Sequence, residues 1–295
     1  YDTPEVDKDF IACDWNEGDN HLDNFKNLKL DSYVRGDLEK IAISCARNIL
    51  DIPNNLDLRL TSGSDVGILI TLLYLGSTSF SSFRMRQNDY AQVRAFAEIS
   101  FEKIDIQPDD SIFENIYSKS VIYLSNPGNP TCKYYSDIEL LKIATDNPES
   151  IFIFDLAYIE YEKPFDVSIF NDLDNVIFLR TFSKYWGLAG ARLGAIAFPL
   201  NSKLNKIYKV FNSKHISQQH LRLLQELNEA KQVLIKKRDN EKLQLEEISK
   251  IISNKFDLST SIAGNFVRFD CVDTLNKEKL AEYFKDLQIT VRDIS

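Results

Sequence analysis

The sequence predicts an α/β fold in which a mainly parallel sheet is covered by helices on both faces, joined to a smaller α+β unit. Strand-like runs rich in β-branched and aromatic residues recur, and helix-like segments separate them. These runs are unbroken apolar stretches, which is typical of parallel strands buried on both faces. After about residue 203 the sequence changes to a long charged segment of helical period. The two textures together indicate two structural units.

The elements are expected in the following order along the chain. The apolar run VGILITLLYLG predicts a buried helix at 66–76, and it is too short for a bilayer, which takes about 20 residues. Strands are expected at 120–125, 150–155, 175–182 and 193–198, and helices at 134–147 and near 164–172. An amphipathic helix is expected over 225–252, followed by strands at 264–270 and 287–293 that flank a helix at 276–286.

Composition excludes several classes of function. The 295 residues carry a formal net charge of −9, which argues against a nucleic acid as the main partner. The four cysteines lie far apart and predict reduced thiols in a cytoplasmic protein, and the acidic N-terminal stretch lacks the pattern of a signal peptide. The three histidines do not cluster at metal-ligand spacing, so no metal is expected. A small molecule is the expected ligand.

Polar residues follow the predicted strands at the point where each strand ends. Asn129 follows the first of them, Asp155 ends the second, and Lys184 follows the third. Ligands of parallel sheets bind beyond the carboxyl ends of the strands. Lys184 stands in RTFSKYWGLAGARLG, with hydroxyl residues before it and Arg192 after it among small residues. These neighbours suit a lysine amine that attacks a carbonyl group, with a phosphate bound close by.

A candidate anion site precedes the helix expected at 66–76. The residues Ser62 to Asp65 leave unpaired backbone N–H groups at a helix N-terminus, where an anion is favoured. Thr181, Ser183 and Arg192 add two hydroxyls and a guanidinium to the same anion. By itself the stretch is interpreted as an ordinary helix cap, and the anion site is the alternative.

Asp155 also has two readings. A buried carboxylate needs a cationic or donor partner, and a protonated pyridine nitrogen would be such a partner. In isolation the favoured interpretation is a cap at the end of a strand. Asn129 lies in the turn SNPGNPTC, whose prolines and glycine hold its amide in a fixed position.

Taken in order, the motifs NPGNPT, FDLAYIEY, TFSKYWGLAGARLG and GNFVRF carry a family resemblance. The chain resembles the class I/II aminotransferases of the fold-type I pyridoxal-phosphate enzymes, and within them the histidinol-phosphate aminotransferase group. DWNEG at 14–18 and the later QITVRD are similar to the terminal motifs of that group. The resemblance covers about residues 14 to 293.

The resemblance implies pyridoxal 5'-phosphate as cofactor and a role for each matching residue. Catalysis falls to Lys184, which binds the cofactor aldehyde and moves protons, to Asp155, which pairs with the pyridine nitrogen, and to Tyr158, which with Asn129 holds the ring oxygen. Tyr90 stacks on the ring. The phosphate is held by Ser64, Asp65, Thr181, Ser183 and Arg192, with Tyr33 reaching it from a second subunit. Arg292 and Asn16 contact the substrate.

The resemblance further implies an activity and an assembly. The expected reaction moves an amino group from an amino acid, glutamate by preference, to a small phosphorylated carbonyl compound, with histidinol phosphate as the type substrate. A homodimer without nucleic-acid or membrane partners is expected, with a large cofactor-binding domain at 31–212 and a small domain built from 1–30 and 213–295. Two alternatives stay open: a decarboxylase of threonine or serine phosphate on the same fold, and a non-catalytic ligand-binding module.

The sequence also departs from the family pattern. Val66 follows Asp65 where the family has an acidic residue, and Cys132 stands where a glycine often follows Asn-Pro-Thr. The stretch SFRMRQNDY before the expected stacking tyrosine is polar and basic. Arg84 and Arg86 in this stretch are interpreted as surface charges, and a contribution to anion recognition is the alternative.

Overall fold

A computed structural model describes residues 11–12, 37–162, 164–200, 202 and 216–292. Its centre is a seven-stranded sheet with the order β2-β8-β7-β6-β5-β3-β4. Only β8 among these strands runs antiparallel to its neighbours, and the other pairs are parallel. The predicted mainly parallel sheet is therefore confirmed. The strands are β2 (Leu56–Thr61), β3 (Ser82–Arg86), β4 (Lys103–Gln107), β5 (Ser120–Ser125), β6 (Ile151–Asp155), β7 (Val176–Thr181) and β8 (Gly194–Pro199).

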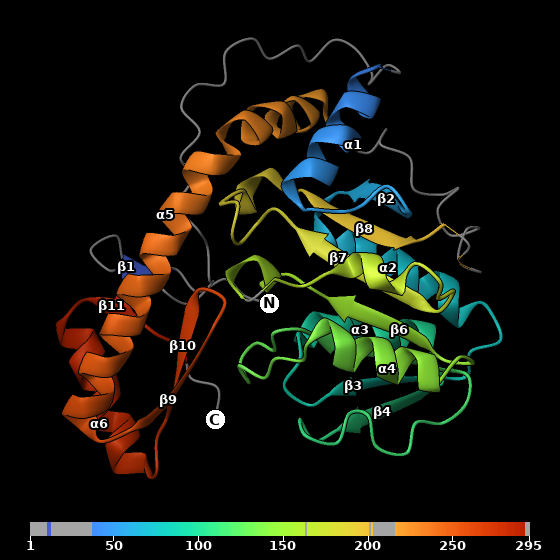
Figure 1. The fold of residues 1–295 in the computed structure, drawn as a ribbon. Coiled ribbons are helices and arrows are strands. Elements are labelled where there is room, and N and C mark those ends of the chain that lie inside the picture. Colours follow the sequence, from blue (N-terminus) through green and yellow to red (C-terminus); the bar gives the residue numbers. More distant parts are fainter. Residues whose placement is uncertain (1–10, 13–36, 163, 201, 203–215, 293–295) are drawn as a thin grey trace.

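Helices cover both faces of this sheet, as the unbroken apolar strands require (Figure 1). On one face α2 (Gly63–Gly76) and α3 (Ala91–Ser100) pack in one apolar cluster with the sheet. On the other face lie α1 (Asp37–Ile49), α4 (Asp137–Asp146) and the first half of α5 (Gln218–Phe256). None of the helices in the described ranges is long and apolar enough to cross a membrane.

Several helical segments differ from the sequence expectation at their ends. Helix α2 begins at Gly63, so Ser64 and Asp65 lie in its first turn. Helix α4 begins after Ser136, which forms a reciprocal capping box with Glu139. The piece near 164–172 is only a 3₁₀ turn at Val167–Phe170, because the Asp166 carboxylate accepts the N–H of Ser168. Propensity does not decide such boundaries; local hydrogen bonds do.

The C-terminal part contains the longest element, α5, whose 39 residues exceed the expected 225–252 (Figure 1). It is followed by the hairpin β9 (Ser259–Ala263) and β10 (Phe266–Asp270), and by α6 (Thr274–Asp286). The strand expected at 287–293 is reduced to β11 (Ile289–Thr290), which pairs in parallel with β1 (Ile11–Ala12). A short N-terminal segment therefore lies beside the C-terminal one.

The interpretation of Arg84 and Arg86 as surface charges is wrong. Both lie on β3, between β4 and β5, and their residues are 2% and 0% exposed. A buried guanidinium is tolerated only when it is paired, and each has an aspartate partner. Arg84 Nη2 lies 2.7 Å from Asp105 Oδ2, and Arg86 Nη2 lies 2.7 Å from Asp89 Oδ1.

Candidate active site

The parallel strands bring the predicted site residues to one edge of the sheet. Ser125, the last residue of β5, is in register with Asp155, the last residue of β6, and Asp155 is in register with Leu179 of β7. The segments that follow these three strands carry Asn129, Tyr158 and Lys184. The topology therefore assembles residues that are far apart in the sequence, as expected at the carboxyl ends of parallel strands.

Asp155 lies on the floor of this edge and is 6% exposed. Its carboxylate accepts hydrogen bonds from the Tyr123 hydroxyl at 2.5 Å and from the Ala157 N–H at 3.0 Å. Both donors are neutral. Burial raises the pKa of Asp155 to about 6, and the two hydrogen bonds oppose that rise. The two hydrogen bonds hold the carboxylate in place. Because burial disfavours its charged form, a cation beside it would be strongly favoured.

Asn129, Tyr158 and Lys184 meet beside Asp155. Asn129 Nδ2 donates to the Tyr158 hydroxyl at 2.8 Å, and Lys184 Nζ lies 5.8 Å from the centroid of the Tyr158 ring. Burial raises the pKa of Tyr158, while Asn129 and the charge of Arg292 lower it in part. Arg292 is exposed, and its charge lowers the pKa of this tyrosine. An amine, a phenol and an amide are therefore grouped at the edge of the sheet where Asp155 lies.

The first turn of α2 and the loop before β8 form a second part of the site. Arg192 Nη2 lies 2.7 Å from Asp65 Oδ2. Gly63 has a φ of +78°, and a Cβ on it would come within 2.8 Å of that same Arg192 nitrogen. A Cβ on Gly194 would come within 2.6 Å of the Ser64 nitrogen. Only glycines let the guanidinium and strand β8 approach the helix N-terminus this closely, which is where an anion is favoured.

The remaining hydroxyls lie beneath this helix start. Thr181 ends β7 and is buried, and its Oγ1 accepts the N–H of Ser183 at 3.1 Å. Tyr90 precedes α3 and is partly exposed. Its electrostatic interaction with Tyr123 contributes to the raised pKa of Tyr123. Asn16 and Tyr33 lie outside the described residues. Groups of His, Cys, Asp or Glu arranged to hold a metal do not occur in the ranges that the structure describes.

The turn that carries Asn129 is fixed from its own ends. The Asn126 side chain donates to the carbonyl of Tyr135 at 2.9 Å and accepts the N–H of Tyr135 at 2.8 Å. Cys132 closes the turn with a φ of +59°, the left-handed conformation that favours glycine. The departure seen in the sequence at this position therefore places a side chain on a backbone conformation that favours glycine.

Three residues at the site were not predicted from the sequence as functional. Tyr123 donates to Asp155, Phe266 packs edge-on against Tyr158 at 5.3 Å between ring centroids, and Gly264 lies so close that a Cβ would come within 2.6 Å of that tyrosine. A tyrosine inside the aliphatic run SVIYLS was the available signal for Tyr123, since a buried hydroxyl needs a partner. Gly264 and Phe266 belong to the motif GNFVRF, which carried the family resemblance without a role for either residue.

Comparisons with known proteins agree with this geometry. A model of the family described as aminotransferase class I and II matches residues 83–285, more than half of the chain. The histidinol-phosphate aminotransferase of Methanococcus aeolicus is 34% identical over 149 residues, which cover 48% of this chain and 39% of that protein. A dihydroxyacetone phosphate transaminase of Campylobacter jejuni is 31% identical over 150 residues, covering 48% of this chain and 38% of that protein. The matched region therefore spans less than half the length of these curated relatives.

A solved structure shares the fold along most of the chain. Histidinol-phosphate aminotransferase from Sinorhizobium meliloti, crystallised with pyridoxal-5'-phosphate, superposes with a TM-score of 0.71 at 20% identity. The superposition covers 88% of this chain and 74% of that one. The expected fold-type I architecture is thereby confirmed. The family match, the order of the motifs and the shared fold lead to one conclusion: this chain belongs to the class I and II aminotransferase family.

Proposed function

We propose that the protein is a pyridoxal-phosphate-dependent aminotransferase that moves an amino group from glutamate to a small phosphorylated carbonyl substrate. The observation that carries the proposal is Asp155, a buried carboxylate held by two neutral donors beneath Lys184, Asn129 and Tyr158. Such a carboxylate suits a cation supplied by a ligand. The names of the Methanococcus and Campylobacter relatives support a phosphorylated substrate.

The residues present fit pyridoxal phosphate at both of its ends. A protonated ring nitrogen would lie against Asp155, and the ring oxygen would lie within reach of Asn129 and Tyr158, which already bond to each other. The phosphate would lie at the start of α2, where glycines leave room and Arg192 supplies charge. Arg192 would then leave its ion pair with Asp65 and bind the phosphate, and Asp65 would contact the phosphate through its backbone N–H. Ser64, Thr181, Ser183 and Tyr90 complete the proposed cofactor-binding set.

When bound, pyridoxal phosphate supplies an aldehyde for covalent attachment and a ring that accepts electrons. Lys184 provides the amine that attaches to it. With the cofactor bound, the freed Lys184 amine would be the base that takes the proton from the substrate's Cα and returns it at the cofactor carbon that carried the aldehyde. Asp155 in its ionised form would hold a proton on the ring nitrogen. Tyr158, positioned by Asn129, would hold the ring oxygen.

Substrate contacts are proposed for Arg292 and Asn16. Arg292 lies close enough to lower the pKa of Tyr158, so an anionic group of the substrate bound by it would face the reacting atoms. We further propose a cytoplasmic homodimer in which Tyr33 reaches the partner's phosphate site. Residues 31–212 would form the large domain, and 1–30 with 213–295 the small one.

The decarboxylase of a phospho-amino acid shares Lys184 and Asp155 and differs in the bond that breaks. One experiment separates the two. The purified protein is loaded with pyridoxal phosphate, and glutamate or threonine phosphate is added. Release of about one 2-oxoglutarate per subunit from glutamate, without carbon dioxide, is the expected result. If threonine phosphate releases carbon dioxide and glutamate does not react, the assignment changes from an aminotransferase to a decarboxylase.

A further inference from the structure

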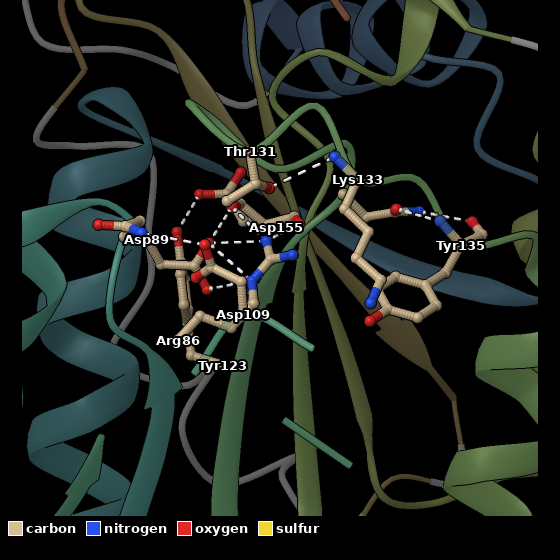
Figure 2. A network of polar contacts seen from close by, with 11 residues as sticks. Arg86, Asp89, Asp109, Tyr123, Thr131, Lys133, Tyr135 and Asp155 are labelled. Carbon is tan, nitrogen blue, oxygen red and sulfur yellow. Dashed lines mark hydrogen bonds and ion pairs between the residues drawn. The ribbon is translucent and has the colours of Figure 1, made fainter. Parts of the chain in front are cut away.

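A buried ion pair, Arg86–Asp89, lies near Asp155 and has no part in the chemistry proposed above. The side chains of Arg86 and Asp89 are 0% and 1% exposed, and Arg86 Nη2 lies 2.7 Å from Asp89 Oδ1. Figure 2 shows both residues beside Tyr123 and Asp155 at the ends of the strands. Arg86 Nη1 is buried and has no hydrogen-bond partner within the described residues. Because a buried donor without a partner costs about 1–3 kcal/mol, stability alone does not explain this pair.

Strand β5 connects the pair to Asp155. Arg86 Nη2 donates to the Ser125 carbonyl at 2.6 Å and to its hydroxyl at 3.0 Å, and that hydroxyl donates to Asp89. Ser125 is in register with Asp155, and the N–H of the next residue, Asn126, donates to the Asp155 carbonyl at 2.8 Å. One strand, β5, therefore separates the ion pair from the Asp155 carboxylate, and both are buried.

Two aspartates act on Asp155, and each has an arginine partner. Asp89 acts from the segment after β3 and Asp65 from α2, and the charges of both raise the pKa of Asp155. Arg86 is paired with Asp89, and Arg192 with Asp65. Further titratable groups at this edge are Tyr123 from β5, Tyr158 from the loop after β6 and Lys184 from the loop after β7. Of the two ion pairs, only Arg86–Asp89 is buried on both sides, so water screens it least.

We propose that Arg86 and Asp89 are positioning residues that set the charge around Asp155, with Asp89 favouring a cation there and Arg86 limiting that effect. The inference rests on the proposed function, because the cation is the protonated cofactor. It assigns a role to the polar stretch SFRMRQNDY, one of the sequence's departures from the family pattern.

The test uses the visible absorption band of the cofactor-loaded protein, which changes when the link between Lys184 and the cofactor loses its proton. In Asp89→Asn the Arg86 charge is no longer offset, so the bound cation is disfavoured. The pH midpoint of the band is then expected to fall by about one unit. The double variant Arg86→Met with Asp89→Asn has the same net charge as the wild type, and its midpoint should return to within about 0.3 units of it.

Asp105→Asn is the matched control, because Asp105 lies on the edge strand β4, away from Asp155, and pairs with Arg84 of β3 at the same distance of 2.7 Å. Its midpoint should stay unchanged. Equal midpoints in the wild type and Asp89→Asn, or an equal fall in the double variant, would overturn the inference while leaving the proposed function intact. A wild type that forms no band would overturn both. If the double variant does not fold, Asp89→Asn against Asp105→Asn decides the question alone.

Discussion

Two polar clusters of this molecule differ in how their charges are matched. At the site edge (Asn129, Asp155, Tyr158, Lys184 and Arg192), the central carboxylate is held by neutral donors. At a second cluster, the α5 anchor (Glu160, Arg180, Trp186, Arg238 and Glu241), acids and bases of the chain pair with one another. Arg180 Nη2 lies 2.9 Å from Glu160 Oε1, and Arg238 forms an ion pair with Glu241.

The α5 anchor connects the long helix to the loop next to Lys184. Arg238 is 2% exposed, and its Nε donates to the carbonyl of Tyr185 at 2.6 Å, one residue after Lys184. Trp186 donates to Glu160 at 3.1 Å. The comparison shows that a buried charge can serve two purposes. Where the chain supplies the counter-charge, the pair fixes structure, and where the chain supplies only neutral donors, the charge suits a charged ligand.

The largest expected effect is the loss of turnover when the site edge alone is disrupted. Lys184→Ala removes both the attachment point and the base, so turnover should fall by on the order of 10³-fold or more. Thermal unfolding of the cofactor-free variant should stay near that of the wild type. Lys231→Ala, which removes a lysine paired with Asp51 outside the site, is the control and should keep its turnover. Turnover near wild type in Lys184→Ala would remove the basis of the assignment.

The next effect would break the α5 anchor alone. Arg238→Met leaves Glu241 and the Tyr185 carbonyl without their donor, and we expect a loss of about 2–3 kcal/mol in the free energy of unfolding. Denaturant unfolding measures it. Because the anchor carries no ligand charge, the pH midpoint of the cofactor band should not move. A variant of wild-type stability would show that the helix is held by apolar packing instead.

A third prediction concerns the cost of the unmatched carboxylate. The pKa of Asp155 in the folded, cofactor-free protein is about 6, above the value of about 4 in an unfolded chain. Ionised Asp155 therefore lowers stability above pH 6, and this cost disappears as the pH falls toward 4. Asp155→Asn should stabilise the cofactor-free protein at pH 8 by about 2 kcal/mol and weaken cofactor binding.

The control for this prediction is the pH dependence itself. The gain from Asp155→Asn should shrink when unfolding is measured near pH 5, where the wild-type carboxyl has begun to take up a proton. A destabilised variant at pH 8 would mean that the two hydrogen bonds to Asp155 outweigh its buried charge.

The smallest expected effect concerns the phosphate end of the site. Arg192 is half exposed, so its loss should weaken cofactor binding about tenfold without unfolding the protein. Titration of cofactor-free Arg192→Ala with pyridoxal phosphate measures the affinity, and Arg59→Ala, which removes another partly exposed arginine paired with an aspartate, is the control. An unchanged affinity would place the phosphate elsewhere.

Much of the large sheet could be predicted because its strands are unbroken apolar runs, and the residues after them had to meet at one edge. The contacts that cross between strands could not. Arg86 and Asp89 stand in a stretch of surface-like composition, and they are buried because β3 lies between β4 and β5, where both contact Ser125. The short strand β11 was also missed in its length, because its pairing partner is a two-residue strand far away in the sequence.

The central claim is that the site edge holds pyridoxal phosphate on Lys184. The most direct measurement is to load the purified protein with the cofactor, reduce it with borohydride, digest it and map the modified lysine by mass spectrometry. We predict about one cofactor per chain, on the peptide that contains Lys184, and none on that peptide in Lys184→Ala. Modification spread over other lysines, or absent, would contradict the account.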